Sequence, residues 1–197
     1  MNEFKRVIVV TGTPGVGKTT VSQILGSKLN ATHIDLTKLV KEEALTSGVD
    51  KIRGTLIADM EKVSERMQKL IEDCKRDIVV DGHYAVNVLP AKDIHFVFVL
   101  RRNPEELREA MKNRGFKGRK LWENLAAEVL DVCLWNAVRA CGSEKVCEID
   151  TSGKKIEEVV EEIVSVLEGK RKLSIGIVDW LGRLEREGRL NDFLKDF

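Results

Sequence analysis

One stretch near the start of the chain limits the possible folds more than any other. An apolar, β-branched run, Val7–Thr11, leads into the turn Gly12–Thr19, which satisfies the pattern G-x-x-x-x-G-K-[ST]. Apolar residues at helical spacing follow from Val21 onward. A strand, this turn and a helix in that order predict a phosphate-binding loop. The alternative, a glycine-rich strand-to-helix turn without a ligand, is disfavoured because the motif lies between the two elements that it requires.

The parts of this loop have separate physical roles. Glycines let backbone N–H groups turn inward and approach phosphate oxygens closely. The helix that begins near Gly17 points its free N–H groups and its positive dipole end at the same anion. We expect Lys18 to reach the β- and γ-phosphates of ATP and the hydroxyl of Thr19 to bind Mg²⁺.

Composition narrows the class of protein. The chain has 197 residues, of which 43% are hydrophobic and 33% charged, as is typical of one soluble α/β domain. The net charge of +1 creates no overall field that would attract nucleic acid or a membrane surface, so sequence-specific nucleic-acid binding is not expected. No apolar run approaches the ~20 residues of a membrane span. The N-terminus lacks the apolar core of a signal peptide.

The four cysteines indicate a reducing environment. They form no C-x-x-C pair, and no histidine lies at zinc-like spacing from them. Free, buried or half-buried thiols in the cytoplasm are therefore expected.

Apolar runs alternate with amphipathic stretches along the chain. Strands are expected at 5–11, 32–35, 77–81, 94–100 and 145–149. Helices are expected at 17–29, 36–45, 55–74, 103–114, 121–141 and 151–167, with a turn at 46–50 and a loop at 51–54. This alternation predicts a three-layer α/β/α fold around a five-stranded parallel sheet, with the ligand at the carboxyl ends of the strands.

Two residues at the end of the third predicted strand, Asp81 and His83, are candidates for metal binding or catalysis. Asp81 ends a buried strand, as the Mg²⁺-holding acid of many nucleotide-binding proteins does, although a turn-forming aspartate is the alternative. His83 lies at the same mouth, where it could orient water, move a proton or contact phosphate, or simply be a hydrogen-bonded loop residue. His33 and His95 lie in or beside strands and are interpreted as structural.

Two segments could complete a site for a second substrate. The stretch 114–121 carries four cations and two glycines between helices, which predicts a mobile lid, with a solvated basic connection as the alternative. The segment 36–67 exceeds the dozen or so residues of a simple crossover and predicts an acceptor-binding helix–loop–helix insertion. Lys41 and Arg53 are its candidate phosphate-binding cations.

The chain divides into a phosphate-loop domain, 1–168, and a C-terminal extension, 169–197. In the extension Ile177, Leu181 and Leu184 share a helical face, with Trp180 nearby. We expect a helical tail that packs back onto the domain, and a docking helix for a partner is the alternative.

These features together resemble a known family, the nucleoside monophosphate kinases, and within them the adenylate kinase isoenzyme 6 family. The resemblance covers about residues 5–168. The similar stretches are Gly12–Thr20, Leu39–Glu43, Val80–His83 and Arg114–Asn124, followed by Ala127–Val129.

The resemblance implies transfer of phosphate from ATP to a nucleoside monophosphate, usually AMP, with Mg²⁺. It also implies ATPase activity and a role in maturation of the small ribosomal subunit, with a small-subunit ribosomal protein and the pre-ribosome as partners. By similarity, Arg114 would contact ATP from the lid, and His83 would serve catalysis. The residues implied to hold the nucleotide are Gly12, Gly15, Gly17, Lys18, Thr19 and Thr20, with Thr19 and Asp81 at the metal.

The sequence departs from the family at two places. Lys41 stands where arginine is common, and a lysine cannot grip a phosphate through two parallel hydrogen bonds. The segment after about residue 168 extends beyond the family core. Three hypotheses follow: a monophosphate kinase, an ATP-hydrolysing ribosome-assembly factor with incidental kinase activity, and a kinase of another hydroxyl-bearing metabolite.

Overall fold

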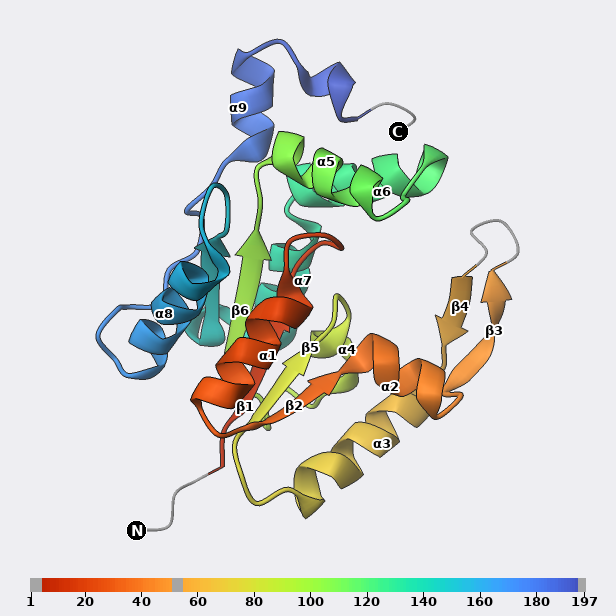
Figure 1. Cartoon of the computed structure of the whole chain (residues 1–197), viewed down its shortest axis with the longest axis vertical. Coiled ribbons are helices and arrows are strands. Elements are labelled where there is room, and N and C mark those ends of the chain that lie inside the picture. The colour runs from red at the N-terminus through yellow and green to blue at the C-terminus, as the bar shows by residue number, and fades with distance from the viewer. Residues whose placement is uncertain (1–4, 51–54, 195–197) are drawn as a thin grey trace.

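Five parallel strands form the centre of the computed structural model, which describes residues 5–50 and 55–194. Their order across the sheet is β2-β5-β1-β6-β7, so the strand before the glycine-rich turn is central (Figure 1). The bounds are β1 Val7–Thr11, β2 Thr32–Asp35, β5 Ile78–Asp81, β6 Phe96–Arg101 and β7 Val146–Asp150. Each pairing is parallel. The three-layer prediction is therefore confirmed.

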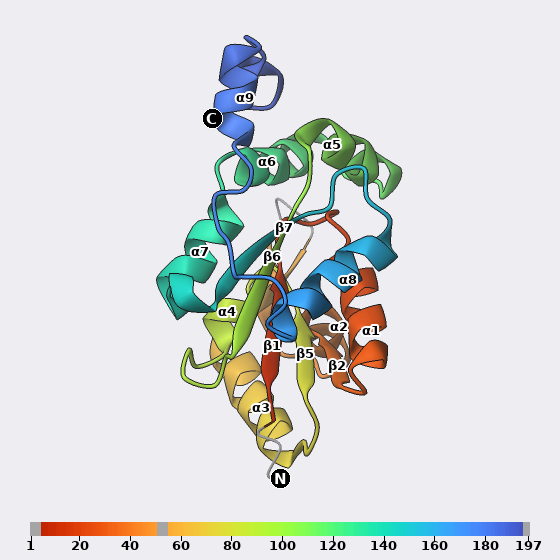
Figure 2. The same ribbon diagram turned by 90° about the vertical axis from the view of Figure 1, so that its left-hand side faces the viewer.

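Helices cover both faces of this sheet (Figure 2). On one face α1 (Lys18–Lys28) and α8 (Ile156–Leu167) pack on Ile8 and Val10. On the other face α3 (Met60–Asp73), α4 (Ala85–Val88) and α7 (Val132–Cys141) join a cluster that includes Val7 and Val9. Alternate residues of β1 thus enter two separate cores, which explains why the strand is apolar throughout.

The segment between β2 and β5 differs from the expected helix–loop–helix. Helix α2 (Leu36–Glu42) is followed by β3 (Thr46–Asp50), predicted as a turn, and by β4 (Thr55–Ala58), predicted as the start of a helix. The two strands pair with each other antiparallel, and this pairing overrides the helical spacing read along a single chain. Asp59 then caps α3 through the backbone N–H of Lys62. The predicted loop 51–54 lies outside the described residues.

The long helix expected at 121–141 is two helices. Helix α5 (Pro104–Asn113) is followed by α6 (Gly118–Val129), and α7 begins only after a break at Asp131, whose φ is +56°. A residue with a left-handed backbone conformation interrupts a helix. At this break the carboxylate of Asp131 forms an ion pair with the buried Arg101. Because α6 begins at Gly118 and not near residue 121, the connection between α5 and α6 is shorter than predicted.

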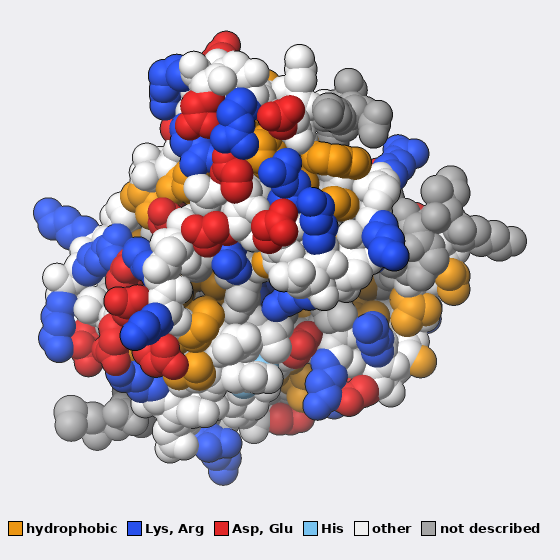
Figure 3. Space-filling model, turned by 45° about the horizontal axis from the view of Figure 1, so that its top comes forward, with side chains coloured by type: hydrophobic (Ala, Val, Ile, Leu, Met, Phe, Trp, Pro, Cys, Tyr) orange, Lys and Arg blue, Asp and Glu red, His pale blue; other side chains and the backbone are white. Residues whose placement is uncertain are grey.

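The tail packs on the helices that flank this connection. Helix α9 (Trp180–Arg186) and the short turn Leu190–Asp192 cover α5 and α6, and Trp180, Leu184 and Phe193 are buried. Ile177 precedes the helix, and it and Leu181 stay 40% and 39% exposed. Acidic and basic side chains are interspersed over this end of the molecule (Figure 3).

Cys141 and Cys147 are buried, Cys74 and Cys133 are partly buried, and all four are free. Within residues 5–50 and 55–194, no helix combines the length and apolarity needed to cross a bilayer.

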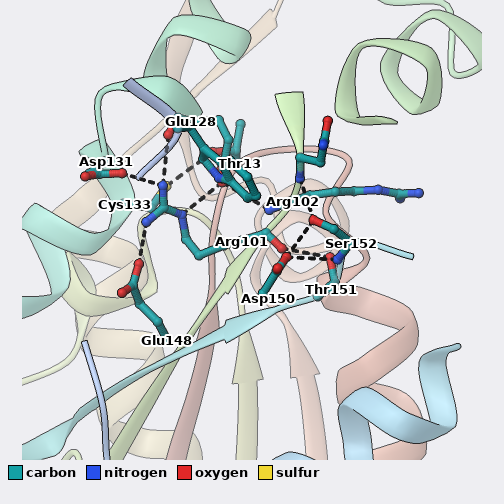
Figure 4. Close-up of polar contacts among 12 residues, drawn as sticks. Thr13, Arg101, Arg102, Glu128, Asp131, Cys133, Glu148, Asp150, Thr151 and Ser152 are labelled. Carbon is teal, nitrogen blue, oxygen red and sulfur yellow. Dashed lines mark hydrogen bonds and ion pairs between the residues drawn. The ribbon is translucent and has the colours of Figure 1, made fainter. Parts of the chain in front are cut away.

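A buried arginine lies where β6 ends. Arg101 is 1% exposed, and its guanidinium pairs with Glu128 of α6, Glu148 of β7 and Asp131 (Figure 4). It also donates to the backbone carbonyl of Glu128. Glu128 and Glu148 are 1% and 0% exposed. Because buried charges are tolerated only when paired, these three side chains depend on one another.

We predict that Arg101→Met destabilises the protein by about 3–5 kcal/mol, because it leaves Glu128 and Glu148 as buried carboxylates without their counter-charge. Urea unfolding at neutral pH, followed by circular dichroism, measures the change. Arg119→Met is the control, since Arg119 is 75% exposed and pairs only at the surface with Glu123; it should cost less than about 1 kcal/mol. A loss for Arg101→Met as small as that of the control would contradict the prediction.

Candidate active site

One large cavity, of about 990 Å³, lies at the carboxyl ends of β1 and β5. Its wall combines four parts of the chain that are distant in sequence: the loop before α1, the segment after β5, the α2–β4 insertion and the α5–α6 connection. This is where a doubly wound sheet holds a ligand, and the cavity lies at the edge of the sheet where the sequence predicts one.

The loop before α1 has the backbone of a phosphate cradle. Gly12, Gly15 and Gly17 have φ of 136°, 100° and 103°, which side chains rarely allow. At Gly12 a Cβ would also lie 2.4 Å from the backbone oxygen of Leu100. The glycines therefore let the loop approach β6 closely while α1 begins immediately after it. Gly15, Gly17, Thr19 and Thr20 line the cavity, and Gly12 forms the base of the loop beneath them.

Lys18 curls back over this loop. Its Nζ donates to the carbonyl oxygens of Gly12 (2.8 Å) and Thr13 (3.1 Å). Loss of hydration lowers the pKa of Lys18, while the negative charges of Asp81 and Glu128 act in the opposite direction. The ammonium is thus held at the centre of the loop by weak carbonyl partners, and an anion in the cradle would replace them.

Asp81 is held from both sides. The hydroxyl of Thr19 donates to Oδ1 at 3.0 Å, and Nε2 of His33 lies 2.6 Å from Oδ2. Asp81 is 2% exposed yet lines the cavity. A threonine hydroxyl beside a carboxylate is an oxygen donor set of the kind that Mg²⁺ accepts, usually with phosphate oxygens and water as its other ligands. The described residues contain no cluster of three or more histidine, cysteine or acidic side chains that would indicate a dedicated metal cage.

His33 was therefore underestimated by sequence reasoning, which treated it as structural. It lies on the edge strand β2 opposite Val79 of β5, and its ring reaches the side chain of Asp81, two residues further along β5. No sequence motif marks this pairing. His95 does match its structural interpretation, since its Nδ1 accepts a hydrogen bond from the backbone N–H of Val7 at 3.1 Å.

His83 lines the cavity two residues beyond Asp81. Its ring meets that of Tyr84 edge to face, with centroids 4.7 Å apart. The His83 side chain is exposed, but the cavity walls limit the hydration of a charged ring. This desolvation, helped by the positive charge of Lys18, lowers the pKa of His83 to about 4. The imidazole is therefore neutral at physiological pH.

The opposite end of the cavity is formed by the insertion. Lys41 lies there with Val40 and with three aliphatic residues around β4, namely Leu56, Ile57 and Met60. These three side chains are 51%, 47% and 39% exposed, so they form an apolar wall with little to cover it. Arg53, the other cation expected at the acceptor, lies outside the described residues.

Two of the four expected lid cations lie at the cavity. Arg114 and Lys120 contribute to its wall, together with Phe116, over which the Lys120 ammonium lies at 5.0 Å from the ring centroid. Arg119 instead pairs with Glu123. This division follows from the early start of α6 at Gly118, which places the cations from that residue onward on a helix, where they point in different directions.

Glu128 is a second residue that the sequence did not single out for a role. It accepts a hydrogen bond from the Thr13 hydroxyl of the loop at 2.6 Å (Figure 4). The sequence did offer a signal: Glu128 is a charged residue within an apolar helical face, and Arg101 stands at the end of an apolar strand.

We predict that His83 titrates near pH 4 and that Lys18→Met raises its pKa without restoring 6.5, because desolvation is the larger cause. Imidazole proton shifts measured by NMR across pH test this, with His83→Gln used to assign the signal. Since the unfolded state binds the proton at higher pH, His83 lowers stability as the pH falls from about 6.5 to 4, and His83→Gln should remove that part of the acid sensitivity. A titration close to 6.5 in the native protein would contradict the prediction.

Comparisons with known proteins identify the family of the chain. A family model described as "AAA domain" matches residues 8–131. A protein named "Putative adenylate kinase" from Methanocaldococcus jannaschii is 39% identical over 174 residues, covering 88% of this chain and 92% of that protein. Its namesake from Methanosarcina barkeri is 39% identical over 184 residues, covering 89% and 97%.

Solved structures support the fold alone. Shikimate kinase from Bacteroides thetaiotaomicron superimposes with a TM-score of 0.56 at 18% identity, covering 83% of this chain and 98% of that one. Thymidylate kinase from Candida albicans gives 0.56 at 17% identity, covering 86% and 97%. Together with the cradle, the paired Thr19 and Asp81, and the sequence relatives, these findings show that the chain belongs to the P-loop nucleoside monophosphate kinase family of archaeal proteins named "Putative adenylate kinase".

Proposed function

We propose that this protein transfers the γ-phosphoryl group of ATP to a nucleoside monophosphate, with AMP as the first candidate, in a Mg²⁺-dependent reaction. One observation carries the proposal: the phosphate cradle and the insertion wall face each other across one cavity of about 990 Å³. A triphosphate in the cradle and a monophosphate against the insertion would then place donor and acceptor in line. Catalysis would come from positioning and charge, with no covalent intermediate.

Each candidate residue has a role in this proposal. Lys18 would bind the β- and γ-phosphates of ATP, and Arg114 would approach from the lid as it closes. Mg²⁺ would be held by Thr19 and Asp81 and would neutralise charge between the phosphates. The remaining nucleotide contacts would come from the backbone around Gly12, Gly15, Gly17 and Thr20.

The acceptor would occupy the insertion end. Lys41 lies at the cavity and could contact the acceptor phosphate, while Arg53 remains a candidate on sequence alone. The exposed Leu56, Ile57 and Met60 would be covered by the flat apolar face of a base. An apolar wall favours a planar, weakly hydrated group over a polyhydroxylated acceptor, which supports a nucleotide over a sugar acid.

ATP hydrolysis is a second candidate activity, and the position of His83 in the cavity wall favours it. An imidazole at the cavity could orient an attacking water by a hydrogen bond. Adenylate kinase isoenzyme 6-like proteins, which the chain resembles, suggest that such hydrolysis would serve assembly of the small ribosomal subunit through a small-subunit ribosomal protein.

A paired assay tests the two activities. ADP and inorganic phosphate are both measured from ATP and Mg²⁺ with AMP, CMP, UMP or GMP, and in separate arms with shikimate or gluconate. We expect AMP-dependent ADP formation without matching phosphate release, and loss of at least about 100-fold in Lys18→Ala. Phosphate release that ignores every monophosphate, but responds to a ribosomal protein, would replace the kinase with the second candidate.

We further predict that His33 keeps Asp81 oriented toward the metal. ADP binding is measured by calorimetry with Mg²⁺ and with a chelator. In His33→Ala the enhancement of ADP affinity by Mg²⁺ should fall about tenfold, because Asp81 loses its partner on Oδ2. His33→Gln keeps an N–H donor and should recover most of the enhancement. Equal losses with and without Mg²⁺ would show instead that His33 only supports β2.

A further inference from the structure

The C-terminal tail contacts the buried Arg101 cluster at two points. The indole Nε1 of Trp180 donates to Oε1 of Glu128 at 3.3 Å, and the backbone N–H of Ile177 donates to Oε2 of Glu148 at 3.0 Å. Both acceptors are partners of Arg101. A segment that only covered apolar surface would have no reason to reach two buried carboxylates.

The tail is also fixed on either side of these contacts. Before them, the backbone N–H of Glu148 donates to the carbonyl of Ser174 at 2.8 Å. After them, Arg183 and Arg189 both donate to the carboxylate of Glu105 at the start of α5, at 2.5 and 2.7 Å. With Leu184 and Phe193 fully buried, Trp180 is held in one place over the cluster, 8% exposed.

Glu128 connects this tail to the phosphate cradle. Its Oε1 accepts from Arg101 Nε, the backbone N–H of Arg102 and Trp180, and its Oε2 accepts from the hydroxyl of Thr13 (Figure 4). One carboxylate therefore ties β6, the loop before α1 and the tail together. The orientation of Oε2 toward Thr13 depends on the donors that hold Oε1.

Thr13 in turn positions Lys18. The carbonyl of Thr13 accepts from Lys18 Nζ at 3.1 Å and from the backbone N–H of Val16 at 3.4 Å. Thr13 is 1% exposed, and its hydroxyl lies between Glu128 Oε2 at 2.6 Å and Cys133 Sγ at 4.0 Å.

We propose that Trp180 is a positioning residue for the nucleotide site: through Glu128 and Thr13, the C-terminal tail sets the shape of the phosphate cradle. The indole supplies the last donor to Glu128 and excludes water from the cluster, which keeps its hydrogen bonds strong. The C-terminal tail is accordingly part of the donor site, although it touches no substrate. The inference rests on nucleotide binding at the cradle and does not require phosphate transfer.

A double-mutant cycle on ADP affinity tests this coupling in the full chain. Trp180→Phe keeps the ring and removes the N–H donor, and Thr13→Val removes the hydroxyl that Glu128 accepts. Calorimetry with Mg²⁺ should give an ADP Kd raised about threefold or more by Trp180→Phe and about tenfold by Thr13→Val. Because both act through Glu128, the double variant should bind no more weakly than Thr13→Val alone, whereas independent effects would multiply to about 30-fold.

Leu184→Val is the matched control. It removes a methylene from the same helix and should lower the melting temperature. Because the aliphatic side chain of Leu184 forms no hydrogen bond with Arg101, Glu128 or Glu148, the ADP Kd should stay unchanged. Trp180→Phe that lowers the melting temperature but not ADP affinity would overturn the proposal, as would multiplicative losses in the cycle or an equal loss in Leu184→Val. A chain that binds ADP but transfers no phosphate would refute the proposed reaction and leave this test intact.

Discussion

The charge of Arg101, buried at the carboxyl end of β6, organises the end of the molecule where the site lies. A guanidinium removed from water must be paired, and its partners come from α6, β7 and the break before α7. Meeting that requirement fixes where α6 ends and how the loop before α1 is held, because Glu128 serves both Arg101 and Thr13. The tail closes the same cluster from outside.

Contacts within the chain define the cradle. Its glycines adopt the backbone that a side chain would forbid, Lys18 already lies over the loop, and Asp81 is fixed between Thr19 and His33. A nucleotide would exchange the carbonyl partners of Lys18 for phosphate oxygens, with little rearrangement of the backbone. Preorganisation of this kind is the main way in which an enzyme of phosphoryl transfer lowers its barrier.

The insertion end of the cavity was predicted less well from sequence, for identifiable reasons. The hairpin β3–β4 forms because two short segments pair with each other, and spacing along either segment alone cannot show that partnership. The same hairpin brings Leu56 and Ile57 to the cavity, where no motif predicted a wall. The break between α6 and α7 was missed because it serves Arg101, a partner 30 residues away in sequence from Asp131.

The sequence alone determined the central strand, the glycine turn with Lys18 and Thr19, and Asp81 at the end of the third predicted strand. These features depend on contiguous patterns of hydrophobic periodicity, glycine and charge. It also determined the alternation of strands and helices that produces a parallel sheet within a three-layer fold. Only the tertiary structure decided that His33 holds Asp81, that Glu128 accepts a hydrogen bond from Thr13, and that the indole of Trp180 donates to the same Glu128. Those contacts join side chains from separate elements across register and packing, and a buried charge reveals its partner only once the chain has folded around it.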